Sequence, residues 1–172
     1  ELPLKEDILI TLDREQDVHA AWDKSIIEHQ FLKDNDFVLG YFHNLDSGRQ
    51  KPYYVKKRHP ESALHTFYVD LIYQEIRKYT KDVEKYRTEK PDIIFTNKVD
   101  QEIGIEVETG IGVKSPSKKE YHNEKFARCR EKWANRCYIF LIRKDLKNSY
   151  KRHKLPILFR LQVKEFVRLQ FS

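Results

Sequence analysis

The longest apolar stretch of the chain, Cys137 to Ile142, constrains the fold more than any other feature. Consecutive apolar residues of this kind are typical of a central β-strand that is covered on both faces, usually by helices. The stretch is far shorter than the roughly 20 residues that a membrane-spanning helix needs. Of the 172 residues, 40% are hydrophobic and 35% are charged, which suits one core beneath a charged surface. We therefore expect an α/β protein that is cytoplasmic, with no membrane segment and no secretion signal.

Apolar periodicity predicts two helices around this strand. From Pro60 to Tyr79, apolar residues recur every three or four positions, which indicates a helix with one buried face. Ser117 and Glu120 have the spacing of a capping box, and an apolar stripe follows them on a second helix. The two stripes consist of Leu64, Phe67, Tyr68, Leu71, Ile72, Ile76 and Tyr79, and of Tyr121, Phe126, Cys129 and Trp133.

Extended segments complete the predicted core. Strand-forming residues occur at 82–87, 91–97 and 102–108, and again at 157–159. The tail that ends at Phe171 forms either a last helix or an edge strand. The order helix, three strands, helix, strand predicts an α/β sandwich around a mixed sheet, flanked by helices, for residues 58–172.

Residues 1–57 are expected to form a separate element made of a helix and a β-hairpin. Apolar spacing predicts a helix over 13–30, and strand formers around a turn predict a hairpin over 36–55. The hairpin has a basic tip, Arg49 and Lys51, and a basic exit. Two interpretations stay open: part of a winged helix whose hairpin touches DNA phosphates, or an ordinary hairpin that extends a sheet.

Several classes of chemistry have no support in the sequence. Cys129 and Cys137 show no metal-binding spacing and are expected to be reduced intracellular thiols. Neither a serine nucleophile motif nor a glycine-rich phosphate loop is present. Because the chain has no Met and begins at Glu1, we expect it to be part of a larger chain or complex.

Carboxylates converge in the stretch from Pro91 to Glu108. Side chains alternate along a strand, so Glu106 and Glu108 share one face while Val107 lies on the other. If 91–97 and 102–108 pair as a hairpin, Asp92 approaches the end of the second strand. Three carboxylates in one small volume repel each other unless a cation neutralises them, so the cluster is a natural Mg²⁺ site. The alternative is a strand with one solvated, charged face and no function.

These residues resemble the signature of the PD-(D/E)xK nuclease superfamily, the restriction-endonuclease-like fold. The signature is a Pro-Asp at one strand and an acidic residue, any residue and Lys on the next. Pro91-Asp92 and Glu106-Val107-Glu108 match these positions, and the resemblance covers about residues 60–145. Glu108 stands where the motif Lys is usual. In some members that position carries Glu, and in others the Lys has moved to a nearby helix.

The resemblance implies Mg²⁺- or Mn²⁺-dependent hydrolysis of a DNA phosphodiester. Asp92 and Glu106 would hold the metal, with the carbonyl of Val107 as a further ligand. The metal would polarise the scissile phosphate and activate a bound water. Glu108 would orient that water or bind a second ion.

The resemblance also calls for a positive side chain and for polar residues on the upstream helix. Lys114, just ahead of the second helix, is the first candidate for the displaced lysine, and Lys118 and Lys125 are the alternatives. Each of these lysines could instead be a solvated surface charge. Glu61 and His65, four residues apart on the upstream helix, would face the site, and Asp70 and Glu75 are less well placed. Because His65 lies at the edge of the apolar stripe, a hydrogen-bonded structural histidine is an equal alternative. His122 and His153 are interpreted as surface groups.

Basic residues gather after residue 113 and suggest an acidic partner. The chain has 33 Lys and Arg against 27 Asp and Glu, a formal charge of +6. Lysines and arginines on one helix would neutralise DNA phosphates without specifying bases. The expected DNA contacts are Lys118, Lys125, Arg128 and Lys132.

Two alternatives to an active nuclease remain. The first is a nuclease-like DNA-binding module that has lost catalysis, which the missing motif Lys favours. The second is an assembly domain of a mobile element or a virus that uses the same fold as a scaffold. A homodimer is compatible with each of these functions, because nucleases of this class often cut two strands with two subunits.

Overall fold

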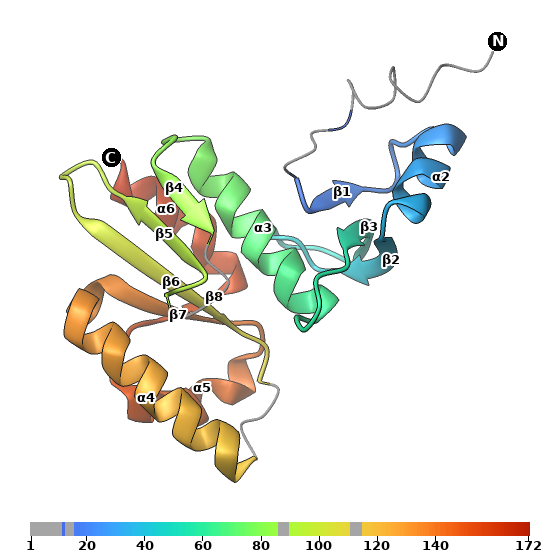
Figure 1. Ribbon diagram of the computed structural model, residues 1–172. Coiled ribbons are helices and arrows are strands. Elements are labelled where there is room, and N and C mark those ends of the chain that lie inside the picture. The colour runs from blue at the N-terminus through green and yellow to red at the C-terminus, as the bar shows by residue number, and fades with distance from the viewer. Residues whose placement is uncertain (1–11, 13–15, 86–89, 111–114) are drawn as a thin grey trace. The chain divides into compact units, whose positions relative to one another are not determined.

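A computed structural model describes residues 12, 16–85, 90–110 and 115–172 (Figure 1). The chain divides into two compact units, Glu1–Leu71 and Ile72–Ser172. Helix α3 (Ala63–Arg77) contains the point of division, and it confirms the helix that apolar periodicity predicts there. The predicted division into domains 1–57 and 58–172 stays a prediction.

The first unit contains a three-stranded antiparallel sheet in the order β1-β3-β2. Helix α2 connects β1 to β2 and begins at a capping box, in which Ser25 and Glu28 each accept a hydrogen bond from the other's backbone N–H. Strands β2 and β3 confirm the predicted hairpin. The elements are β1 (Val18–Ala20), α2 (Ile26–Asp34), β2 (Phe37–Phe42) and β3 (Lys51–Lys56).

The helix predicted over 13–30 is wrong at residues 18–20, which form β1. Val18 pairs with Val55 of β3, and its backbone N–H donates to the Asp70 carboxylate. The apolar residue that suggested a helical face is therefore buried by strand pairing. The helix begins only at Ile26, because the true cap is formed by Ser25 and Glu28. Whether this unit is part of a winged helix stays a prediction.

The second unit is an α/β layer structure around a five-stranded mixed sheet in the order β4-β5-β6-β7-β8. The first three strands pair antiparallel, whereas β6, β7 and β8 pair parallel. The strands confirm the predicted extended segments, including the buried central strand. Their bounds are β4 (Val83–Lys85), β5 (Ile93–Thr96), β6 (Glu102–Glu108), β7 (Cys137–Leu141) and β8 (Ile157–Phe159).

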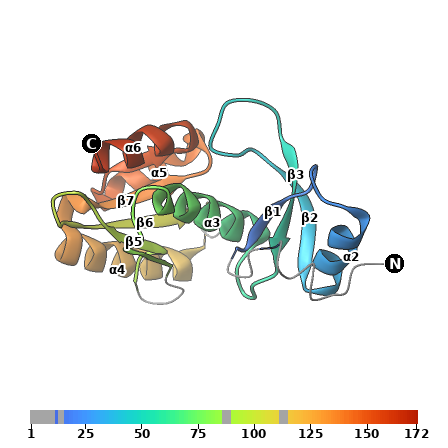
Figure 2. The same cartoon turned by 90° about the horizontal axis from the view of Figure 1, so that it is seen from above.

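Helices cover both faces of this sheet (Figure 2). On one face, α4 (Pro116–Trp133) packs Phe126, Cys129 and Trp133 against Ile139 and Leu141 of β7. On the other, α6 (Val163–Gln170) places Phe166 against Tyr138, with ring centroids 4.5 Å apart. The tail thus ends in a helix, the first of the two forms that the sequence left open. The remaining short elements are η1 (Ala134–Arg136), η2 (Lys144–Leu146), α5 (Lys147–Tyr150), η3 (Lys151–His153) and η4 (Arg160–Gln162).

Helix α4 differs from its prediction by one residue on its buried face. The predicted stripe began at Tyr121, but the side chain of that residue is 54% exposed. His122 is buried instead, in line with Phe126, Cys129 and Trp133. The predicted capping box is also wrong, because Pro116 takes the first helical turn and Ser117 therefore lies inside it. Within the described part of the chain, no helix is both long and apolar enough to cross a membrane.

Candidate functional site

Pairing of β5 with β6 fixes Asp92 beside the two glutamates. Ile93 lies opposite Ile105, so Asp92 is next to the start of β5 and approaches the end of β6. Its Oδ2 accepts a hydrogen bond of 2.8 Å from the backbone N–H of Val107. This bond holds Asp92 against β6, as the predicted hairpin requires.

A glycine makes room for this approach. Gly104 of β6 lies beneath Pro91, and a Cβ on it would stand 3.0 Å from Pro91 Cγ and 3.5 Å from Cys137 Sγ. A proline ring is stiff, so a larger residue at position 104 would push away the turn that carries Asp92.

Strand alternation turns Glu106 and Glu108 toward α4. Glu106 lies opposite Ile139 and Glu108 opposite Leu141, and both of these partners belong to the core that α4 covers. The two glutamates are buried, with 1% and 6% of their surface exposed. The alternative of a solvated, charged face is therefore wrong for this strand, and the carboxylates need neighbours that neutralise them.

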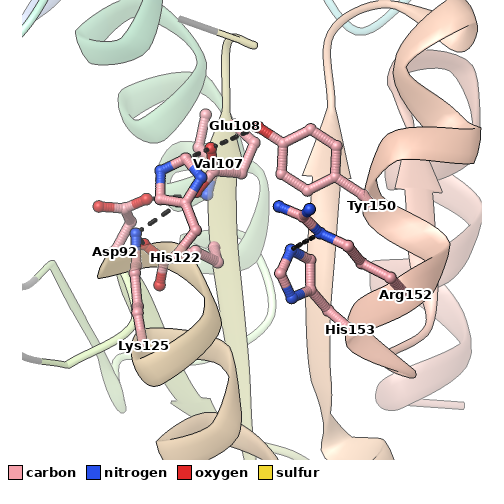
Figure 3. A network of polar contacts seen from close by, with 9 residues as sticks. Asp92, Val107, Glu108, His122, Lys125, Tyr150, Arg152 and His153 are labelled. Atoms are coloured by element: carbon pink, nitrogen blue, oxygen red, sulfur yellow. Dashed lines mark hydrogen bonds and ion pairs between the residues drawn. The ribbon is translucent and has the colours of Figure 1, made fainter. Parts of the chain in front are cut away.

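Lys125 of α4 supplies this neutralising charge (Figure 3). Its Nζ forms an ion pair with Glu106 Oε1 and lies 3.4 Å from Glu108 Oε1. Only 18% of the lysine side chain is exposed. Burial opposes the charge on Lys125, but the carboxylates, Glu106 above all, raise the pKa of its ammonium. Lys125 therefore stays protonated and faces the acidic groups.

The surroundings of Glu106 disfavour the ionised form of its carboxyl group. Burial first, and the nearby charge of Asp92 second, raise the pKa of its carboxyl well above the ordinary value. Its Oε2 is buried and has no hydrogen-bond partner among the described residues. One carboxylate oxygen of the site is thus buried without a donor among the described residues.

Glu108 is held from two sides. Tyr150 of α5 donates a hydrogen bond of 2.9 Å to its Oε2. His122 Nε2 lies 4.0 Å from the same oxygen, and burial lowers the pKa of this imidazole. Figure 3 shows His122, Lys125 and Tyr150 directed at Glu108 from α4 and α5.

Oxygen ligands of the site fit a hard divalent cation in their chemistry. Asp92, Glu106 and the Val107 carbonyl belong to the donor types that Mg²⁺ and Mn²⁺ prefer. The open Oε2 of Glu106 supports such a fit. In the described part of the chain, however, no group of three or more His, Cys, Asp or Glu side chains is placed to hold a metal ion. Here the ammonium of Lys125 supplies the positive charge.

The other predicted residues fall into three groups. Lys118, Arg128 and Lys132 are exposed on α4. Lys114 lies outside the described residues. Glu61 and His65 belong to the first unit, where Glu61 Oε2 lies 3.3 Å from His65 Nδ1, and their part in the site stays a prediction. Lys125, one of the two alternatives for the displaced lysine, is the candidate that contacts the carboxylates.

Three residues of this neighbourhood were not expected. His122 and His153 were interpreted as surface groups, yet both are buried, with 9% and 3% exposed. Arg152 donates to His153 Nε2 at 3.4 Å, and the His153 ring packs on Phe126. Tyr150 is not among the residues that the sequence predicts for the site. The helical spacing of His122 to Phe126 was the one local signal for its burial, whereas Tyr150 reaches Glu108 from 42 residues away.

Comparisons with known proteins give little beyond this geometry. No family model and no curated protein matches the chain. A solved structure, a repair endonuclease from Pyrococcus abyssi, is similar over 69% of this chain at 12% identity, with a TM-score of 0.30. The similar region is 63% of that chain, less than two thirds of its length.

Proposed function

We propose that the protein is a metal-dependent DNA endonuclease of the PD-(D/E)xK, restriction-endonuclease-like type, which hydrolyses phosphodiester bonds. The observation that carries the proposal is the contact of Lys125 with Glu106 and Glu108 beside Asp92. A motif of this kind needs two acidic groups and one lysine at a common point. Here Asp92 directly precedes β5, Glu106 lies on β6, and the lysine comes from α4 in place of the motif position that Glu108 occupies.

Each residue has a proposed role. Asp92, Glu106 and the Val107 carbonyl would hold Mg²⁺ or Mn²⁺, which would polarise the phosphate and lower the pKa of a bound water. The Lys125 ammonium would stabilise the charge that develops on the phosphate oxygens, since such stabilisation is often the largest catalytic effect. Glu108 would hold Lys125 in place and accept hydrogen bonds from the attacking water.

The charge distribution supports DNA as the substrate. The second unit has 24 Lys and Arg against 14 Asp and Glu, a formal charge of +10. The first has 9 against 13, a formal charge of −4. The basic excess therefore belongs to the unit that contains the candidate site, and the exposed Lys118, Arg128 and Lys132 of α4 would contact phosphates.

A nuclease-like DNA-binding module without catalysis is the second candidate. Two observations favour it: Glu108 replaces the usual motif Lys, and the described side chains include no metal-binding group of three. In this case the pairing of Lys125 with the glutamates would be a structural ion-pair network, and DNA would bind only through the basic surface.

Cleavage assays separate the two candidates. The full chain is incubated with branched, single-stranded and duplex DNA and with Mg²⁺ or Mn²⁺, beside the variants Asp92→Asn and Glu106→Gln. We expect wild-type cleavage that depends on the metal and is abolished in both variants, because each removes a charged ligand. Glu124→Gln, an exposed neighbour of Lys125 on α4, is the matched control and should cleave like the wild type.

Cleavage that persists in both ligand variants would contradict the proposed site. DNA binding that is weakened by salt, without cleavage of any substrate, would instead support the binding module.

A further inference from the structure

The polar contacts of Glu108 and Glu106 are unequal. Each oxygen of Glu108 has a partner of its own: Oε2 accepts from Tyr150 at 2.9 Å, and Oε1 faces Lys125 at 3.4 Å. Glu106 contacts Lys125 through Oε1, and its Oε2 has no hydrogen-bond partner among the described residues. Glu108 is therefore fixed in one orientation, whereas Oε2 of Glu106 lacks a hydrogen-bond partner among the described residues.

Tyr150 is itself held firmly in place. It is 1% exposed, and its ring meets Phe126 edge-on, with centroids 6.2 Å apart. The imidazole of His153 lies beside the Tyr150 ring, with the two ring centroids 6.0 Å apart. Burial, and the adjacent Glu108 carboxylate, raise the pKa of the phenol, so Tyr150 keeps its proton and can only donate to this carboxylate.

We infer that Tyr150 is a positioning residue of the proposed metal site, acting through Glu108. Its hydroxyl occupies Oε2 of Glu108 and so directs Oε1 at the Lys125 ammonium. Glu108 thus shares the ammonium with Oε1 of Glu106, and Oε2 of Glu106 stays without a partner among the described residues and available to a divalent cation. Without the hydroxyl, Glu108 could turn away from Lys125, and the ammonium would then be held by Glu106 alone and would compete with the cation there. This inference rests on the proposed function.

The test compares Tyr150→Phe with Glu108→Gln and with the double variant in the full chain. Mn²⁺ binding is measured without DNA, from the electron paramagnetic resonance signal of free Mn²⁺. Direct partners of metal ligands typically contribute about 10- to 100-fold in metal affinity. Tyr150 acts through Glu108 and Lys125 and not on a ligand itself, so Tyr150→Phe should weaken Mn²⁺ binding by about 10-fold, the lower end of that range. The Mg²⁺ concentration for half-maximal cleavage should rise similarly, with unchanged DNA affinity in the absence of metal.

The double variant distinguishes positioning from a general structural role. If Tyr150 acts through Glu108, Tyr150→Phe should have no further effect on Mn²⁺ affinity once Glu108 is Gln. Additive losses, or a Tyr150→Phe chain that binds Mn²⁺ like the wild type, would overturn the inference. Tyr121→Phe, an exposed tyrosine of α4, is the matched control.

Fluorine NMR provides a second measurement if Tyr150→Phe does not fold. With 3-fluorotyrosine at position 150, the resonance should move on Glu108→Gln and again on addition of Mg²⁺ to the otherwise wild-type chain. A resonance that responds to neither change would overturn the inference. Failure of the wild type to bind Mn²⁺ or to cleave DNA would instead remove the proposed function itself, so the two failures are distinguishable.

Discussion

Lys125 decides, at the scale of single residues, whether the buried acidic groups are tolerated. Its ammonium contacts Glu106 and Glu108, which are almost fully buried. Removing one partner of a buried ion pair leaves an uncompensated charge in the interior, which costs more than the pair itself contributes. The lysine is therefore expected to be a structural requirement of the fold as well as a part of the proposed chemistry.

Lys125→Met should lower the free energy of unfolding by about 3–5 kcal/mol, because it leaves two buried carboxylates without their cation. Urea unfolding at neutral pH measures the change. Lys119→Met is the control: this lysine is exposed on the same helix and should change the stability by less than about 0.5 kcal/mol. Equal losses in the two variants would show that Lys125 does not neutralise the site.

His153 contributes to the pH dependence of stability below neutral pH, together with His122, whose pKa is also lowered by burial. Burial, and the charge of Arg152, lower the pKa of its imidazole to about 4, from an ordinary value of 6.5. The unfolded chain therefore binds more protons than the folded chain between these two values. The stability that neutral His153 contributes is complete above about pH 6.5 and is lost as the pH falls toward 4.

His153→Asn should flatten this part of the stability curve. Thermal unfolding midpoints at several pH values between 4 and 7 measure the effect. The exposed His59, replaced by Asn, should leave the slope as it is in the wild type. A wild-type slope that survives His153→Asn would show that other groups cause the pH dependence.

Helix α4 links the core to the site at the scale of elements. Its buried stripe packs on β7, and Lys125, next to the fully buried Phe126, faces the carboxylates. The helix can therefore hold Lys125 beside the carboxylates only while its apolar stripe is packed on β7. The packing of one aromatic ring and the position of one ammonium are expected to depend on each other.

Phe126→Ala should destabilise the protein by about 3–5 kcal/mol, because it removes a fully buried ring and leaves a cavity. Tyr121→Ala changes the residue that the sequence placed in the stripe, but its side chain is 54% exposed, so the expected effect is below about 0.5 kcal/mol. Chemical unfolding of both variants checks the difference. If Tyr121→Ala lowered the free energy of unfolding by more than about 0.5 kcal/mol, Tyr121 would belong to the buried stripe, as apolar periodicity predicts.

Local patterns predict the strands of the site well and its helical partners poorly. The alternation in 102–108 and the Pro-Asp before 93–96 are properties of short segments, so they gave the positions of Glu106, Glu108 and Asp92. The choice of lysine and the contact with Tyr150 depend on how α4 and α5 pack on β6. Such packing brings Glu108 into contact with Lys125, 17 positions along the chain, and with Tyr150, 42 positions along it, and no local periodicity predicts these contacts.

Charge is unevenly distributed at the scale of the whole molecule. The formal charge of +6 is the sum of +10 in the second unit and −4 in the first. The composition of the chain, taken as one number, hides this difference. We therefore expect phosphate contacts to be concentrated on the second unit, and the basic hairpin tip of the first unit to contribute little.

Salt dependence of DNA binding tests this expectation. Replacing both Arg128 and Lys132 of α4 by Gln should weaken binding and reduce the slope of log K against log salt by about two for duplex DNA. Replacing Arg49 and Lys51 of the hairpin tip by Gln removes the same charge and should leave the slope unchanged. An equal fall with the hairpin variant would favour the winged-helix interpretation of the first unit.

Gly104 is expected to tolerate few substitutions, although it has no side chain. A Cβ at position 104 would stand 3.0 Å from the ring of Pro91, and the next residue, Asp92, accepts a hydrogen bond from the backbone N–H of Val107. In a saturation library selected for cleavage, position 104 should therefore tolerate as few substitutions as the carboxylates, although it has no functional group. Sequence variation at Gly104 would then track the geometry of the turn, and a change there would be accompanied by a change at Pro91.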